Sequence, residues 1–187
     1  MSGEAVGARP PKRIGLIMVN TGNGKGKTTA ALGTALRACG HGQRVLMIQF
    51  VKGPWKSGEQ EAAAKLAPNF ELVKMGKGFF KIMNDRLPEE DHKEAARHGL
   101  QLARERIVSG EYDLIILDEI NNAIADGLLP VEPLLELLDS KPYPLHIILT
   151  GRNAHPEVIQ RAHLVTEMTE VKHPYQQGIL AQKGIDF

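Results

Sequence analysis

The chain carries the segment Thr21-Gly22-Asn23-Gly24-Lys25-Gly26-Lys27-Thr28-Thr29 between a short apolar run and a stretch rich in alanine and leucine. Gly26, Lys27 and Thr28 match the end of the Walker A pattern, G-x-x-x-x-G-K-S/T, and Thr21 stands where that pattern has its first glycine. The order of strand, loop and helix is what a phosphate-binding loop requires. A chance turn rich in glycine and lysine is the less favoured alternative.

The residue types of this loop suit a triphosphate. Glycines allow a tight turn whose N–H groups point at phosphate oxygens, and the helix that starts near Lys27 adds the positive end of its dipole. We expect the Lys27 ammonium to reach the outer phosphates and the Thr28 hydroxyl to bind Mg²⁺. Lys25 is equally well interpreted as a solvated lysine. The predicted ATP-binding residues of the loop are Thr21, Gly22, Asn23, Gly24, Lys25, Gly26, Lys27, Thr28 and Thr29.

A second motif lies in the middle of the chain. The apolar run Leu114–Leu117 is followed directly by Asp118 and Glu119, which resembles a Walker B strand. A carboxylate at the end of such a strand can hold Mg²⁺ directly or through water. Asp118 and Glu119 are both candidate ligands, and Thr28 completes the predicted metal site. A strand followed by ordinary surface acids is the alternative, and the preceding phosphate loop makes it the less favoured one.

Apolar runs without alternation recur along the chain and are typical of strands buried on both faces of a parallel sheet. They span Ile14–Val19, Val45–Val51, Phe70–Lys74, Leu114–Leu117 and Leu145–Leu149, with a weaker run near Leu164–Met168. Helical stretches alternate with them at Thr28–Ala38, Ser57 to about Leu66, Pro88 to Gly110, Pro130–Leu138, Pro156–Ala162 and Tyr175–Lys183. The alternation predicts an α/β fold with a doubly wound, mostly parallel sheet flanked by helices, like that of RecA-like P-loop NTPases.

Length and composition favour a single domain. Residues 1–13 are small, polar and proline-bearing, so we expect a flexible tail before one α/β domain over residues 14–187. Lysine plus arginine number 23 and aspartate plus glutamate 22, a balance that argues against a nucleic-acid or anionic-membrane partner. The single cysteine excludes a disulfide framework and a four-cysteine zinc site. Since neither a membrane span nor a secretory signal is recognisable, we expect a cytoplasmic protein.

A phosphate loop does not by itself name the reaction, so residues for a second substrate must come from other strand ends. Arg152 follows the fifth apolar run and is a candidate anion contact, and hence a further ATP-binding residue. Lys52 and Trp55 follow the second run, and Phe79 and Phe80 follow the third. Aromatic residues in loops at the ligand edge suggest a flat apolar partner such as a macrocycle or a base, with core packing as the equal alternative.

Residues 19–31 resemble the phosphate loop of the P-loop corrinoid adenosyltransferases. The resemblance continues at Gln49–Trp55, Gly58-Glu59, Leu117–Ile120, Ile148–Arg152 and Glu170–His173, and it ends at Ala181–Phe187. Thr21 in place of the first Walker glycine is itself typical of that family. The resemblance therefore covers nearly all of the chain after residue 13.

The resemblance implies that the 5′-deoxyadenosyl group of ATP is transferred to the cobalt of cobalamin or of a corrinoid precursor. Reduced Co(I) would attack the ribose C5′ carbon and inorganic triphosphate would leave, in the biosynthesis or salvage of adenosylcobalamin. The implied ligands are ATP, Mg²⁺ and a reduced corrinoid. The resemblance also implies a homodimer, with a reduced flavoprotein as an electron donor.

Roles for individual residues follow from the resemblance. Lys27, Thr28 and Glu119 are the expected catalytic residues, because charge on the leaving triphosphate must be neutralised. The expected corrinoid-binding residues are Lys52, Trp55, Phe79 and Phe80. The family displaces the lower axial cobalt ligand with aromatic residues after the third strand, which makes Phe79 the first candidate. A tryptophan expected two positions later is Lys81 here, and Phe80 can take its place.

Other classes of P-loop protein remain alternatives. A nucleoside kinase would need a catalytic carboxylate, for which Glu119 could serve, and a RecA-like ATPase would need an arginine finger at an oligomeric interface. A regulatory nucleotide-binding module would perform no chemistry. The products distinguish these classes, because only an adenosyltransferase forms an adenosylated corrinoid and triphosphate.

Overall fold

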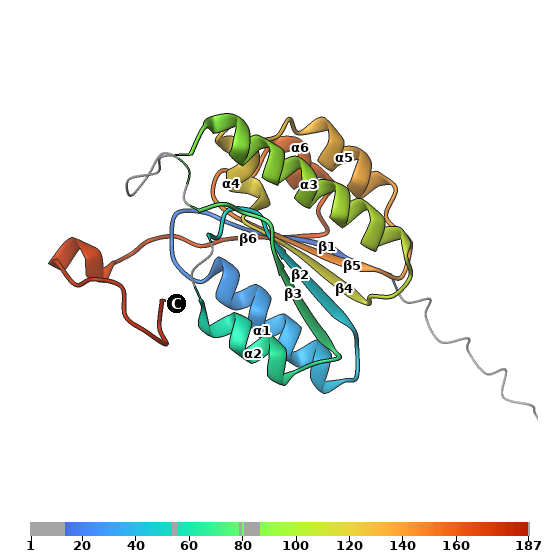
Figure 1. Cartoon of the computed structure of the whole chain (residues 1–187), viewed down its shortest axis with the longest axis horizontal. Helices are drawn as coiled ribbons and strands as arrows, with labels where there is room; N and C mark the ends of the chain where they lie inside the picture. The colour runs from blue at the N-terminus through green and yellow to red at the C-terminus, as the bar shows by residue number, and fades with distance from the viewer. Residues whose placement is uncertain (1–13, 54–55, 79, 81–86, 187) are drawn as a thin grey trace, which may run out of the picture.

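The computed structural model describes residues 14–53, 56–78, 80 and 87–186, which form one sheet with helices on both of its faces (Figure 1). The sheet has six strands in the order β3-β2-β4-β5-β1-β6, and every pairing is parallel. The strands are β1 (Ile17–Thr21), β2 (Val45–Gln49), β3 (Phe70–Lys74), β4 (Leu114–Asp118), β5 (His146–Thr150) and β6 (Leu164–Glu167). The predicted doubly wound α/β fold is confirmed.

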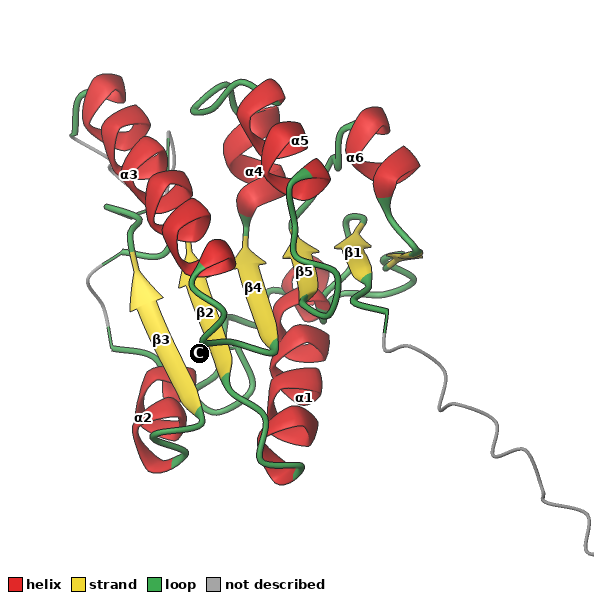
Figure 2. Ribbon diagram, turned by 90° about the vertical axis from the view of Figure 1, so that its right-hand side faces the viewer, coloured by secondary structure: helices red, strands yellow, loops and turns green. Residues whose placement is uncertain are grey.

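Helices cover the two faces unequally, as Figure 2 shows. One face carries α1 (Lys27–Gly40) and α2 (Gly58–Lys65). The other carries α3 (Glu89–Val108), α4 (Ile120–Ala125), α5 (Glu132–Asp139) and α6 (Pro156–Arg161). None of these helices has the length and apolar character needed to cross a bilayer.

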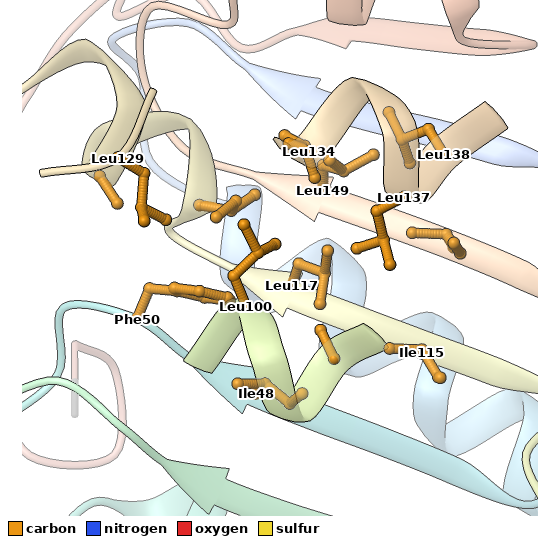
Figure 3. Close-up of a cluster of buried hydrophobic side chains, with 14 of the residues drawn as sticks. Ile48, Phe50, Leu100, Ile115, Leu117, Leu129, Leu134, Leu137, Leu138 and Leu149 are labelled. Carbon is orange, nitrogen blue, oxygen red and sulfur yellow. The ribbon is translucent and has the colours of Figure 1, made fainter. Parts of the chain in front are cut away.

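Alternate side chains of the central strands enter two separate cores. In β2, Val45 and Met47 pack with the buried alanines of α1, whereas Leu46 and Ile48 pack on the side of α3 and α5. Figure 3 shows the larger cluster, in which Leu117 of β4 lies between the strands and the helices above them. Because both faces are buried, the central strands are apolar up to their last residue, which explains their unbroken runs.

Three local predictions differ from the structure. The first strand begins at Ile17 rather than Ile14. Helix α4 was not predicted, because its six residues are too few to display a helical period. The helix predicted over Tyr175–Lys183 was wrong: only a 3₁₀ turn at Pro174–Gln177 forms, followed by Gly178 with a φ of 73°. No residue of that turn is buried, so no packing energy stabilises a longer helix there.

The topology brings several polar strand ends to one edge of the sheet. Gln49 at the end of β2 is the register partner of Asp118 at the end of β4. Asn20 of β1 is likewise the partner of Thr150 at the end of β5. Ligands of doubly wound sheets bind at the carboxyl ends of the strands, so this edge is the place to examine for a site.

Candidate functional site

The phosphate loop connects β1 to α1 across the carboxyl edge of the sheet. Gly22 and Gly26 have φ values of 92° and 108°, a region that residues with a Cβ rarely adopt. Gly26 is the N-cap of α1, so the first turn of that helix faces the loop. The buried residues Ala31, Ala35 and Ala38 hold α1 against the sheet, which fixes the direction of the helix dipole toward a bound anion.

The end of β6 packs directly on this loop. The Gly24 N–H donates to the Met168 carbonyl at 2.7 Å, and the Met168 N–H donates to the Thr21 carbonyl at 2.8 Å. A Cβ on Gly22 or Gly24 would lie 2.5 Å or 2.8 Å from the Met168 oxygen. The glycines are therefore required by a neighbouring strand as well as by a phosphate, a reason that the sequence did not reveal.

Lys27 lies inside the loop and is joined there by a second cation. Its ammonium donates to the carbonyl oxygens of Gly22 at 2.8 Å and Gly24 at 2.6 Å. Burial, and then the charge of Arg152, lower the pKa of Lys27. Arg152 itself is exposed, and its backbone N–H is held by the Asn122 side-chain oxygen at 3.0 Å. Lys27 and Arg152, each predicted to bind ATP, are therefore near enough for the charge of one to affect the other.

Asp118 is fully buried at the end of β4 and accepts three hydrogen bonds from neutral groups. Its Oδ1 receives the hydroxyls of Thr28 at 2.8 Å and Thr150 at 2.7 Å, and its Oδ2 receives the Gln49 amide at 3.0 Å. Burial raises the pKa of Asp118, while these three donors oppose the increase. Because Thr28 gives its only proton to Asp118, the lone pairs of the Thr28 oxygen are free for a cation.

Glu119 follows Asp118 with a backbone φ of 63°, which turns the chain out of the strand. Its N–H donates to the Thr150 hydroxyl at 2.9 Å, but its buried Oε2 has no hydrogen-bond partner among the described residues. Burial, followed by the charge of Asp118, raises the pKa of Glu119 to about 7. A buried carboxylate oxygen without a partner is a suitable ligand for a divalent cation.

The donor set fits Mg²⁺ bound together with a triphosphate. The Thr28 oxygen and the Glu119 carboxylate are both available, and both residues line the same cleft. Within the described part of the chain, no group of three or more His, Cys, Asp or Glu side chains could hold a metal ion by itself. Magnesium usually binds to one or two protein ligands plus phosphates and water, so this small set is sufficient.

A cleft of about 710 Å³ opens beside these groups. Its polar part is formed by the phosphate loop with Lys52, Glu59 and Glu119, and an apolar arm runs between α1 and α2. The arm is lined by Leu32, Gly33, Leu36, Ala62, Leu66 and Phe70. Near the C-terminus, Gly184, Ile185 and Asp186 also line the cleft, and Asp186 forms an ion pair with Lys25.

The residues predicted to contact a corrinoid are placed differently from one another. Lys52 lines the cleft, where its ammonium lies 2.7 Å from a carboxylate oxygen of Glu59. Phe80 is buried in the core, with its ring 5.3 Å from that of His92. Trp55 and Phe79 lie outside the described residues. The structure thus brings Lys52 to the cleft, and it places Phe80 in a packing contact rather than in the cleft lining.

Sequence reasoning missed three polar residues of the site: Gln49, Glu59 and Thr150. Gln49 is a polar residue within the run Val45–Val51, and Thr150 directly follows the run Leu145–Leu149. Each is the last residue of a buried strand, and a polar residue at that place is the signal that would have found them. Glu59 carries no such signal, because only the folded path of the loop after β2 brings the start of α2 next to Lys52.

Comparisons with known proteins agree with this geometry. The model of the family described as "ATP:corrinoid adenosyltransferase BtuR/CobO/CobP" matches residues 13–187. The corrinoid adenosyltransferase of Escherichia coli K12 is 39% identical over 173 residues, which are 92% of this chain and 86% of that protein. The Pseudomonas aeruginosa corrinoid adenosyltransferase is 37% identical over 173 residues, 92% of this chain and 84% of that protein.

A third relative, the corrinoid adenosyltransferase CobA of Salmonella typhimurium, is 36% identical over 181 residues, covering 96% of this chain and 89% of that protein. Among solved structures, the flagellar accessory protein FlaH from Methanocaldococcus jannaschii has a TM-score of 0.52 at 14% identity, covering 83% of this chain and 71% of that one. This likeness concerns the fold alone. The family match and the near-complete coverage of the three relatives show that this chain belongs to the ATP:corrinoid adenosyltransferase family.

Proposed function

We propose that this protein transfers the 5′-deoxyadenosyl group of ATP to Co(I) of cobalamin or of a corrinoid precursor and releases triphosphate. The proposal is carried by the family match over residues 13–187 in a chain that keeps the phosphate loop and the Thr28–Asp118 contact in place. A cobalt–carbon bond forms and the bond between C5′ and the phosphate oxygen breaks. Co(I) supplies the new electron pair, and the pair of the broken bond leaves with triphosphate.

The protein does not need a nucleophile of its own, because the corrinoid brings one. Its tasks are to hold C5′ in line with the cobalt and to neutralise charge on the leaving triphosphate. Lys27 is suited to the second task, since its ammonium already lies among the loop carbonyls of Gly22 and Gly24. Arg152 adds a second cation close enough to lower the pKa of Lys27.

Magnesium would be held by Thr28 and Glu119, with Asp118 orienting Thr28 from behind. Asp118 has three hydrogen-bond donors, whereas Glu119 has a buried oxygen without a partner. The metal supplies charge neutralisation on the phosphate oxygens. The buried oxygen without a partner supports Glu119 as the direct ligand and Asp118 as the outer one.

The corrinoid would approach the polar part of the cleft from the loop that follows β2. We propose that Lys52 and Trp55 contact it there, and that Phe79 takes the side of the lower cobalt ligand. Lys52 lines the cleft and lies next to Glu59, which supports its part of the proposal. A reduced flavoprotein would supply the electron that converts the corrinoid to Co(I).

We also propose a homodimer in the cytoplasm. Strand β6 is at the edge of the sheet, and Leu164 and Val165 on it are 51% and 38% exposed. An apolar edge strand is a ready site for pairing with a second copy. Sedimentation equilibrium across a range of concentrations tests this state, and a strictly monomeric protein would contradict it.

The test of the reaction uses the purified protein with Mg–ATP and chemically reduced cobalamin in the dark. We expect a light-sensitive cobalt–carbon bond in the corrinoid spectrum and intact triphosphate as the phosphate product. Lys27→Ala should abolish both, whereas Lys56→Ala, a control at an exposed lysine outside the cleft lining, should keep both. Release of ADP without an adenosylated product, from cobalamin and from a precursor, would refute the proposal and favour a kinase or an ATPase.

A further inference from the structure

Gln49 is a polar side chain in a place where the fold needs none. It ends β2, is fully buried, and follows the apolar residues Met47 and Ile48. Its Oε1 has no hydrogen-bond partner among the described residues, a cost that a leucine or methionine of similar size would avoid. The reason for a glutamine must therefore lie with its other side-chain atom, the amide nitrogen.

That nitrogen lies between two carboxylates. Gln49 Nε2 is 3.0 Å from Oδ2 of Asp118 and 3.5 Å from Oε1 of Glu59. Two carboxylates accept hydrogen bonds only, so the orientation of the amide is determined. Within the described residues, Gln49 provides the one hydrogen bond to Oδ2 of Asp118, while Thr28 and Thr150 both bind Oδ1.

The contacts link the two ends of the polar cleft. Lys52 pairs with Glu59 at 2.7 Å, Gln49 joins Glu59 to Asp118, and Asp118 receives the Thr28 hydroxyl at 2.8 Å. The register of β2 against β4 makes this link, because Gln49 and Asp118 are direct partners with side chains on the same face. An apolar residue at position 49 would leave Oδ2 of Asp118 without its donor.

We propose that Gln49 is a positioning residue for Mg–ATP. Its amide holds Asp118 in the orientation that accepts the Thr28 proton, so that the lone pairs of Thr28 face the metal. Its amide also joins the Lys52–Glu59 pair to Asp118. This contact holds the corrinoid side of the cleft in a fixed position relative to the metal side. This inference rests on the proposed binding of Mg–ATP at the loop and goes beyond it by adding a residue that touches neither substrate.

The test compares ATP affinity with and without the metal, by calorimetry in excess Mg²⁺ and in EDTA. The dissociation constant in EDTA divided by the dissociation constant in Mg²⁺ measures how much the metal strengthens ATP binding. In Gln49→Leu we expect that ratio to fall about tenfold, the usual order for one hydrogen bond to a charged group. The dissociation constant in EDTA should stay within about twofold of the wild-type value, because Lys27 and the loop amides are unchanged.

Two further variants separate positioning from folding. Gln49→Asn keeps the amide but withdraws it by one methylene group, so its ratio should fall in the same direction even if the leucine variant does not fold. Gln101→Leu is the matched control on the opposite face of the sheet, where the side chain is exposed and donates, among the described residues, to Glu105. Its ratio should equal that of the wild type.

Three results would overturn the inference. One is a wild-type ratio in both Gln49 variants. Another is an equal loss of affinity with and without Mg²⁺, as expected of a residue that only supports the fold. The third is a wild-type ATP affinity that does not depend on Mg²⁺ at all. Failure of the proposed reaction appears separately, as absence of adenosylated corrinoid from the wild-type protein.

Discussion

Replacement of Glu119 by glutamine should change how the free energy of unfolding depends on pH. The pKa of Glu119 is raised to about 7, mainly because its carboxyl group is buried. In the unfolded chain the same group has its ordinary pKa of 4.5. Between these two values the folded state keeps a proton that the unfolded state releases, so the unfolding free energy of the wild type falls as the pH rises through this window.

The size of the effect follows from the pKa difference. Each pH unit of separation is worth about 1.4 kcal/mol, so charging Glu119 costs the folded wild type about 3 kcal/mol above pH 7 and almost nothing below pH 4.5. Glu119→Gln never acquires this charge. Its unfolding free energy relative to wild type should therefore rise by about 2 to 3 kcal/mol between pH 5 and pH 8.

Urea unfolding at several pH values, in EDTA to keep divalent cations away from the site, measures this difference. Taking the change between two pH values removes any constant effect of the amide group. Glu61→Gln, a matched substitution at an exposed residue of α2, is the control for exchanging a carboxyl group for an amide. A difference for Glu119→Gln that stays constant within about 0.5 kcal/mol from pH 5 to pH 8 would refute the reasoning.

Three further predictions concern the loop, the C-terminal segment and the core. Gly22→Ala would place a Cβ 2.5 Å from the Met168 oxygen at a residue with a positive φ. It should therefore lower the unfolding free energy by about 1 to 3 kcal/mol and weaken ATP binding. Unchanged stability would contradict this prediction. Asp186→Asn removes the carboxylate that pairs with Lys25 and so would compete there with a phosphate. Calorimetry should show ATP affinity increased, by no more than about fivefold, and weaker binding would contradict the competition. Leu137→Ala empties a fully buried position in α5 and should cost about 2 to 5 kcal/mol in urea unfolding, whereas a loss under about 1 kcal/mol would contradict close packing there.

The parts of the fold that the sequence predicted are those with a local physical cause. A strand buried on both faces is apolar along its length, so the first four residues of β2 and of β4 are unbroken apolar runs. The phosphate loop has a fixed set of residue types for the same kind of reason. Helix α4 and the false helix at Tyr175–Lys183 were misjudged, because a short buried helix and an exposed turn are decided by what surrounds them.

The same distinction between local and tertiary causes applies to the candidate site. Lys27, Thr28, Asp118 and Glu119 could be named from the sequence, since each follows a strand in a recognisable motif. Their roles could not be separated, because the difference between Asp118 and Glu119 lies in which hydrogen-bond donors reach them. Those donors come from α1, β2 and β5.

By itself, the sequence determined the α/β class, the phosphate loop and the family, because apolar periodicity and motif chemistry depend on neighbours along the chain. Only the tertiary structure decided that β6 requires Gly22 and Gly24, and that Gln49 joins Asp118 to Glu59. These contacts join residues far apart in the chain, and they depend on strand order and register. A register shift of one residue would turn Gln49 to the other face of the sheet and away from Asp118.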